Sequence, residues 1–120
     1  MPKKILAVDD EASLRELLKR AFSSSDYHVT LASGAEEARA LMTANIYDLL
    51  ITDLILADGA GTELVEFSAR RHGATKSIMI SGAIDPWVMP LFVEKYKLEG
   101  FFAKPFRIDA LLAKVKELLG

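Results

Sequence analysis

The sequence predicts an α/β domain, a doubly wound (βα)5 unit whose parallel five-stranded sheet has the strand order 2-1-3-4-5. Short apolar runs, typical of strands covered on both faces, alternate with segments whose apolar residues recur at helical spacing. Such alternation implies parallel strands joined by right-handed crossovers. The length of 120 residues suits one compact domain, residues 1–120, without internal repeats or linkers.

The first two units occupy the first third of the chain. Residues 5–8 form a continuous apolar strand, and the stripe over residues 14–22 predicts a helix that the polar segment 23–26 ends. Residues 27–32 alternate apolar and polar side chains, as a half-buried edge strand does. Because this edge strand is second along the chain, the order 2-1-3-4-5 is favoured, with its switch point between the first and third strands.

The second helix is predicted from a capping signal and an apolar stripe. Ser33 and Glu36 have the spacing of a capping box, and apolar residues recur over 35–42. Residues 49–52 are then a buried strand. A glycine-bearing loop, residues 57–61, leads to the third helix, whose apolar residues include Leu64, Val65 and Phe67.

The last two units complete the pattern. Residues 77–80 are a buried strand, 100–103 a short final strand, and 108–119 carry the stripe of a closing helix. Between these two strands, Pro86 suits the first turn of a helix. Pro90 lacks a backbone donor, so we expect it to shorten or kink the fourth helix.

Reactive side chains follow four of the five predicted strands. Asp9 and Asp10 follow the first strand, Asp53 the third, Ser81 the fourth and Lys104 the fifth. Ligands of open parallel sheets bind beyond the carboxyl ends of the strands, near the switch point. We therefore expect three carboxylates, a hydroxyl and an ammonium group to meet at one rim of the sheet.

Each of these residues also has a structural interpretation. Asp10 suits a helix N-cap, Asp53 a turn, Ser81 a cap and Lys104 a solvated surface. Together these interpretations are poor, because three clustered carboxylates repel one another and raise their pKa values. A cation relieves that repulsion, and oxygen ligands without His or Cys favour Mg²⁺.

A carboxylate beside a metal ion and a lysine suits phosphoryl transfer. The ion and the ammonium offset charge on the phosphoryl oxygens while a carboxylate oxygen attacks in line. The central position of Asp53, between the acidic pair and Lys104, marks it as the nucleophile, which would form an aspartyl phosphate. Ser81 is then expected to donate a hydrogen bond to the transferred group.

Composition excludes several other functions. The absence of cysteine rules out disulfides and thiolate chemistry, and His28 and His72 are too few for a zinc site. No apolar run approaches the roughly eighteen residues of a membrane span. A net charge of −2 without a basic stripe argues against direct binding of nucleic acid. The first residues do not have the pattern of a signal peptide, so we expect a cytoplasmic protein.

With these residues in order, the sequence resembles a response-regulator receiver domain of two-component signalling, a family with a flavodoxin-like fold. The resemblance runs from Lys4 to Leu119. The matching motifs are Asp9-Asp10, Asp53, Ile80-Ser81-Gly82 and Phe101-Phe102-Ala103-Lys104-Pro105-Phe106.

The resemblance implies a role for each site residue. Asp53 takes a phosphoryl group from a sensor histidine kinase or phosphotransfer protein, and Lys104 contacts that group. Asp10, Asp53 and the backbone carbonyl of Ile55 hold Mg²⁺ directly, while Asp9 acts through water. Such a domain is a phosphoacceptor with slow self-dephosphorylation, not a turnover enzyme.

The resemblance also implies a switch and an output face. Ser81 and Phe101 match the switch pair, and helix 4, strand 5 and helix 5 form the face that controls an output domain or protein. The same face offers a contact for a homodimer. The Lys104–Pro105 peptide is often cis in this family.

Several positions depart from the family pattern. Ala57 stands where a proline is usual and Ala60 where an aspartate is common, so the loop after Asp53 is expected to be less constrained. Lys97 stands where a glycine often ends the fourth helix. The apolar Ile55 and Ala83 flank the approach of water in this family, which implies slow loss of the phosphoryl group.

Two other functions agree less well with the sequence. One is a pseudo-receiver, a phosphorylation-independent interaction module, which the complete set of acidic, hydroxyl and lysine residues disfavours. The other is a phosphatase of the haloacid dehalogenase type, which needs an aspartate where Ile55 stands. A nucleotide-binding loop of the Gly-x-x-x-x-Gly-Lys-Ser/Thr type is absent from the sequence.

Overall fold

The computed structural model describes residues 2–120 and contains a parallel five-stranded sheet. The strands are β1 (Lys3–Val8), β2 (Tyr27–Ala32), β3 (Leu49–Asp53), β6 (Lys76–Ser81) and β7 (Gly100–Ala103). Their spatial order is β2-β1-β3-β6-β7, and every neighbouring pair is parallel. The predicted order 2-1-3-4-5 is therefore confirmed, because β4 and β5 belong to a separate hairpin.

Burial explains the place of each strand in the sheet. All five residues of β3 are buried, as are most residues of β1 and β6, which agrees with their continuous apolar sequences. The alternating strand β2 is half-buried and lies at one edge. The short strand β7 lies at the other edge.

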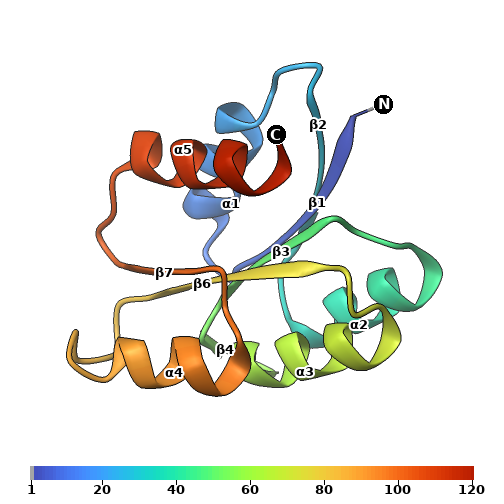
Figure 1. The fold of residues 1–120 in the computed structure, drawn as a ribbon. Coiled ribbons are helices and arrows are strands. Elements are labelled where there is room, and N and C mark those ends of the chain that lie inside the picture. The colour runs from blue at the N-terminus through green and yellow to red at the C-terminus, as the bar shows by residue number, and fades with distance from the viewer. Residues whose placement is uncertain (1) are drawn as a thin grey trace.

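Helices cover both faces of the sheet (Figure 1). On one face, α1 (Ala12–Ala21) and α5 (Ile108–Leu119) pack with Ile5, Ile51 and Ile78 in one core. On the other, α2 (Ala35–Ala44), α3 (Gly61–Arg71) and α4 (Met89–Tyr96) pack with Leu6 and Leu50 in a second core. Successive residues of a strand thus serve opposite cores.

The predicted capping box at the start of α2 is wrong by one position. The N-cap residue is Gly34, and Ser33 donates its backbone N–H to Glu37 Oε1 at 2.7 Å instead of pairing with Glu36. The missing cap comes from another part of the chain. Asp58 accepts hydrogen bonds from the backbone N–H groups of Ala35 and Glu36, at 2.7 and 3.0 Å.

The fourth helix begins later than the sequence suggests. Pro86 lies in a turn before α4, and Pro90 is the second residue of the helix. A proline is tolerated there, because first-turn N–H groups have no partner within the helix. The helix has only eight residues and begins one residue before Pro90. It ends at Lys97, whose φ of 54° is left-handed, where the family often has glycine.

A small antiparallel hairpin follows β3, in a region that the sequence suggests is a loop. It consists of β4 (Ile55–Leu56) and β5 (Gly59–Ala60), with Ala57 and Asp58 at the turn. Leu56 is buried in the core beneath α3, whereas Ile55 is 59% exposed. The hairpin thus lies between the third strand and the third helix.

Among residues 2–120, no helix has the length and apolar character needed to cross a membrane.

Candidate functional site

The predicted site residues gather at one rim of the sheet, at the carboxyl ends of the strands. Asp9 follows β1, Asp53 ends β3, Ser81 ends β6 and Lys104 follows β7. Asp9, Asp53 and Ser81 are buried, whereas Asp10 is exposed. Parallel pairing of neighbouring strands brings these residues together, since it aligns the strand ends at the same edge.

Lys104 links two of the carboxylates. Its Nζ donates to Asp53 Oδ2 at 2.8 Å and to Asp9 Oδ2 at 3.1 Å, and its side chain is 24% exposed. The Lys104–Pro105 peptide is cis, as the resemblance implies. One ammonium group therefore offsets charge on two aspartates at the ends of different strands.

Burial and hydrogen bonding oppose each other in this cluster. Burial raises the pKa of the Asp9 carboxyl, and hydrogen bonds from the Glu11 N–H and from Lys104 only partly offset that effect. Burial alone would lower the pKa of Lys104, but its hydrogen bonds with Asp53 and Asp9 raise it above its ordinary value. The ammonium form of Lys104 is therefore favoured at neutral pH.

Three carboxylates in this cluster have the geometry of a cation site. One oxygen from each of Asp9, Asp10 and Asp53 lies within 4.8 Å of the others. Lys104 contacts only two of these groups, so negative charge remains at the exposed side of Asp10. An all-oxygen donor set with excess negative charge fits a hard divalent ion such as Mg²⁺.

The chain directly after Asp53 is held close to it. The backbone N–H of Ile55 donates to Asp53 Oδ1 at 3.3 Å, and Gly61 donates its N–H to the Leu54 carbonyl at 2.8 Å. A Cβ atom on Gly61 would overlap the Asp53 carbonyl oxygen. Glycine at this position is therefore required by the close approach of the two backbone segments.

The candidate switch residues lie on neighbouring strands. The Ser81 hydroxyl accepts a hydrogen bond from the Ala83 N–H at 3.1 Å. Phe101, on β7, is half-buried, and its ring meets that of Phe92 edge to face with centroids 6.3 Å apart. Since Phe92 belongs to α4, the Phe101 ring contacts the helix expected at the output face.

Two residues near the site were not singled out from the sequence. Arg15, on α1, donates from Nη1 to the Asp9 carbonyl at 2.6 Å. The only sequence feature that indicates this contact is the place of Arg15 on the helix directly after Asp9 and Asp10. Asp58 caps α2 from the hairpin after Asp53, and no local pattern indicates that contact, because its partners lie more than twenty residues away.

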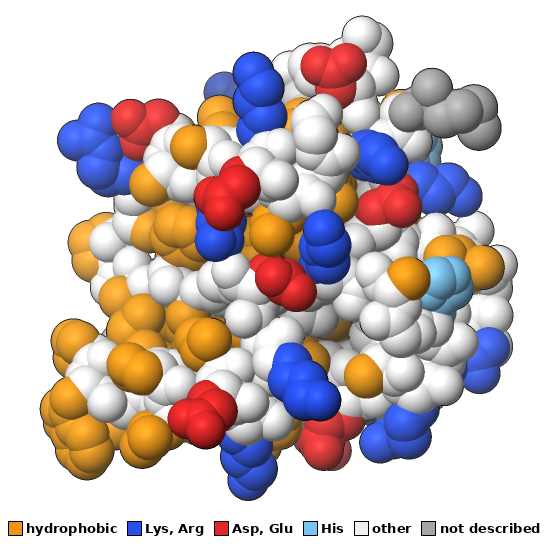
Figure 2. Space-filling model, in the orientation of Figure 1, with side chains coloured by type: hydrophobic (Ala, Val, Ile, Leu, Met, Phe, Trp, Pro, Cys, Tyr) orange, Lys and Arg blue, Asp and Glu red, His pale blue; other side chains and the backbone are white. Residues whose placement is uncertain are grey.

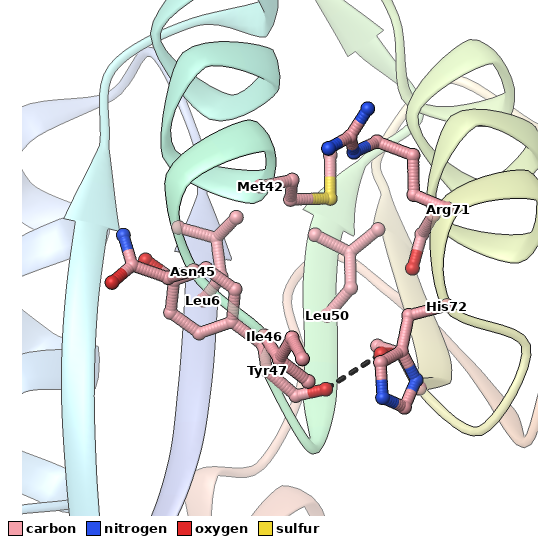
Figure 3. Close-up of a pocket in the computed structure, with 10 residues that line it drawn as sticks. Leu6, Met42, Asn45, Ile46, Tyr47, Leu50, Arg71 and His72 are labelled. Carbon is pink, nitrogen blue, oxygen red and sulfur yellow. Dashed lines mark hydrogen bonds between the residues drawn. The ribbon is translucent and has the colours of Figure 1, made fainter.

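A small pocket lies at the opposite end of the sheet (Figure 3). It is lined by residues of β1, β3, α2 and α3 and of the loops before β3 and β6, where the Thr75 hydroxyl donates to the Tyr47 carbonyl at 2.6 Å. Its volume of about 10 Å³ is the space of about one water molecule. The pocket contains no cluster of carboxylates among its described lining residues, so the reactive groups are concentrated at the Asp53 rim.

Apolar side chains gather on the surface around α4 (Figure 2, lower left). Trp87, in the turn before this helix, is 73% exposed, and Leu91 within it is 58% exposed. Exposed apolar groups of this kind are typical of surfaces that contact other proteins. This surface belongs to the expected output face.

Comparison with known proteins identifies similar sequences over nearly the whole chain. The profile of the response regulator receiver domain matches residues 5–116. Response regulator protein PilR of Pseudomonas aeruginosa is 34% identical over 119 residues, which cover 98% of this chain and 25% of PilR. Response regulator MprA of Mycobacterium sp. strain KMS is 31% identical, with coverage of 99% of this chain and 51% of MprA. The chain thus spans a quarter to a half of these relatives.

Solved structures are similar over the same extent. A CheY-like response regulator receiver domain protein from Methanospirillum hungatei has a TM-score of 0.88 at 29% identity, covering 98% of this chain and 93% of its own. Chemotaxis response regulator CheY4 of Vibrio cholerae has a TM-score of 0.87 at 25% identity, covering 99% of this chain and all of its own.

Proposed function

Because the chain belongs to the response regulator receiver domain family, we propose that it is a phosphoacceptor of two-component signalling and that Asp53 takes the phosphoryl group. The observation that carries this proposal is the Lys104 ammonium group, 2.8 Å from Asp53 and 3.1 Å from Asp9. It is supported by the three carboxylates at the same rim. In this proposal residues 1–120 act as one receiver domain.

The reaction transfers a phosphoryl group from a histidine of a sensor kinase or phosphotransfer protein. An oxygen of the Asp53 carboxylate attacks the phosphorus atom in line, and the phosphorus–nitrogen bond breaks. The histidine nitrogen keeps the electron pair and takes up a proton, and Asp53 becomes an aspartyl phosphate. Lys104 moves its hydrogen bond to a phosphoryl oxygen, and the Ser81 hydroxyl donates to another.

Asp10, Asp53 and the Ile55 carbonyl would hold Mg²⁺ directly, and Asp9 would hold it through water. Bound there, the ion offsets negative charge on the transferring phosphoryl group. Asp9 and Asp10 come from the loop after β1, whereas Asp53 and Ile55 come from the chain at the end of β3. The residues that would hold the ion thus come from the ends of two neighbouring strands.

The signal then passes to the face formed by α4, β7 and α5. When Ser81 turns toward the phosphoryl group, the ring of Phe101 moves inward and changes its contact with Phe92 on α4. An output domain or partner protein, or a second copy of the chain, recognises the changed face. The domain itself contacts neither nucleic acid nor membrane in this proposal, and it acts in the cytoplasm.

The proposal is tested with a small phosphodonor. Wild-type protein, Asp53→Ala and the surface control Asp26→Ala are incubated with acetyl phosphate, with Mg²⁺ or with a chelator. We expect acid-labile phosphate on the wild type and on Asp26→Ala with Mg²⁺, and none on Asp53→Ala. Unphosphorylated wild type would contradict the proposal and favour a phosphorylation-independent interaction module.

The same phosphoprotein reports the rate of self-dephosphorylation. Neither Ile55 nor Ala83 can orient an attacking water molecule by hydrogen bonding from its side chain, and both are exposed. After removal of the donor, we expect slow loss of phosphate, and faster loss when both residues are replaced by polar ones. A double variant that loses phosphate as slowly as the wild type would contradict this part of the proposal.

A further inference from the structure

The hairpin that follows Asp53 is hydrogen-bonded to α2 through the side chain of Asp58. Asp58 lies at its turn, and its two carboxylate oxygens accept separate hydrogen bonds from Ala35 N–H (2.7 Å) and Glu36 N–H (3.0 Å). These are first-turn donors, which have no partner within the helix. These hydrogen bonds lower the pKa of the Asp58 carboxyl, so it is ionised at neutral pH.

Two glycines beside this contact have no space for a side chain. A Cβ atom on Gly34 would lie 2.8 Å from Asp58 Oδ1, and one on Gly59 would lie 3.0 Å from the Ala35 Cβ. The backbone of Gly34 is extended, with φ of −167°, a conformation open to any residue. Its lack of a side chain therefore matters here because it leaves space for the Asp58 carboxylate.

The hairpin also determines where Ile55 lies. Ile55 pairs with Ala60 across the hairpin, and the Ala60 N–H is held by Glu63 Oε1 at 3.0 Å. The Ile55 N–H reaches Asp53 Oδ1 at 3.3 Å, and its carbonyl is the backbone ligand proposed for Mg²⁺. Leu56 anchors the start of the hairpin in the core, and Asp58 anchors its turn.

We propose that Asp58 is a positioning residue, which holds the Ile55–Ala60 hairpin against α2 and so keeps Ile55 in place for Mg²⁺ binding beside Asp53. This inference rests on the proposed function, because it assigns a support to the same site. It also gives a physical role to a contact in a loop that lacks the family's usual proline at Ala57.

Two variants remove the contact from opposite sides, and a third serves as a control. Asp58→Ala deletes the acceptor, and Gly34→Ala displaces the carboxylate without changing it. Glu37→Ala removes the local bond from Ser33 at the same end of α2 but leaves the hairpin untouched. Asp58→Asn, a milder change of the acceptor, is also prepared, and all five proteins, including wild type, are first shown to be folded by far-UV circular dichroism.

Two measurements test the inference. Calorimetric titration with MgCl₂ is expected to show affinity weakened by about tenfold in Asp58→Ala and Gly34→Ala, as for other residues that support metal ligands. Amide hydrogen exchange without metal is expected to be faster across residues 55–60 in both. Glu37→Ala is expected to keep the wild-type Mg²⁺ affinity and exchange rates. Asp58→Asn keeps one acceptor oxygen, so its affinity and exchange rates are expected to lie between those of wild type and Asp58→Ala.

The outcomes separate this inference from the proposed function. If wild type binds Mg²⁺ and Asp58→Ala binds it equally well, the positioning role is wrong while the phosphoacceptor function stands. If Glu37→Ala weakens binding as much as Asp58→Ala, fraying of α2 is responsible and the inference is also overturned. If wild type itself binds no Mg²⁺, the proposed function fails and this inference fails with it.

Discussion

At the scale of single residues, the site places a lysine beside a buried carboxylate, Asp9. The side chain of Asp9 is only 3% exposed, so its ionised form has lost nearly all of its hydration. Lys104 compensates in part, but Asp53 shares the same ammonium group. The net upward shift of the Asp9 pKa shows that burial outweighs the compensating hydrogen bonds.

A consequence is that the charge on Asp9 destabilises the metal-free protein. Because the pKa of Asp9 is higher in the folded than in the unfolded state, the native state binds more protons between the two values. Stability therefore falls as the pH rises through this range. In the presence of a chelator at pH 7, we expect Asp9→Asn, which mimics the protonated side chain, to have a higher thermal midpoint than wild type.

The pH dependence distinguishes this effect from a change in packing. The difference in thermal midpoint between Asp9→Asn and wild type should shrink as the pH falls below the folded-state pKa of Asp9, because Asp9 in the wild type is then protonated too. Asp48→Asn is a matched control, because Asp48 Oδ2 accepts the Lys4 N–H at the other end of the sheet. A difference that persists unchanged at acidic pH would contradict the electrostatic explanation.

At the scale of elements, α4 is the helix least anchored to the core. None of its eight residues, all within the described chain, is fully buried. Only the half-buried Phe92, Val93 and Tyr96 of this helix pack against the core. Phe92 contacts both Tyr96 and Phe101 through its ring. A helix with so few buried contacts can shift at low cost, which suits the element proposed to transmit the signal.

The end of α4 carries a local strain that a substitution can remove. Lys97 has a left-handed backbone, which costs a residue with a side chain roughly 1–2 kcal/mol, whereas glycine adopts it freely. Allowing for the greater flexibility of glycine in the unfolded chain, we expect Lys97→Gly to raise the free energy of unfolding by about 0.5–1 kcal/mol. Urea denaturation measures the change.

Lys95→Gly is the matched control, since it removes an exposed lysine two residues earlier, inside the helix. It should lower the free energy of unfolding by about 1 kcal/mol, because glycine disfavours a helix interior. Equal destabilisation by both substitutions would mean that Lys97 is not strained.

At the scale of the whole molecule, one sheet supports two cores. Leu50 and Ile51 are consecutive in β3 and are 0% and 1% exposed, yet they belong to cores on opposite faces. Both cores use the same strands, so neither can lose its packing without disturbing the sheet that supports the other. We infer that the domain unfolds as one cooperative unit.

Single truncations on the two faces test this cooperativity. Leu50→Ala and Ile51→Ala should each lower the free energy of unfolding by about 2–5 kcal/mol, as expected for a buried aliphatic residue. Far-UV and near-UV circular dichroism should give coincident urea transitions in both variants. The control Leu91→Ala, at an exposed position of α4, should change stability by less than about 0.5 kcal/mol. Transitions that separate in either truncation variant would show that the cores unfold independently.

The sequence by itself determined the type and order of the main elements. Periodicity is a local property, so residues 5–8, 27–32 and 49–52 identify their strands without knowledge of any partner. The alternating pattern of 27–32 even placed its strand at an edge. Because parallel strands align their ends, the candidate residues Asp9, Asp53 and Lys104 also followed from their places after the strands.

Only the tertiary structure decided how distant residues meet. Lys104 contacts Asp9 across 95 positions of the chain, and Asp58 caps α2 from another element. The shifted cap at Gly34 follows from that second contact. Hydrogen-bond donors are satisfied by whichever acceptor lies near in space, and local sequence patterns carry no information about an acceptor that arrives from a different segment.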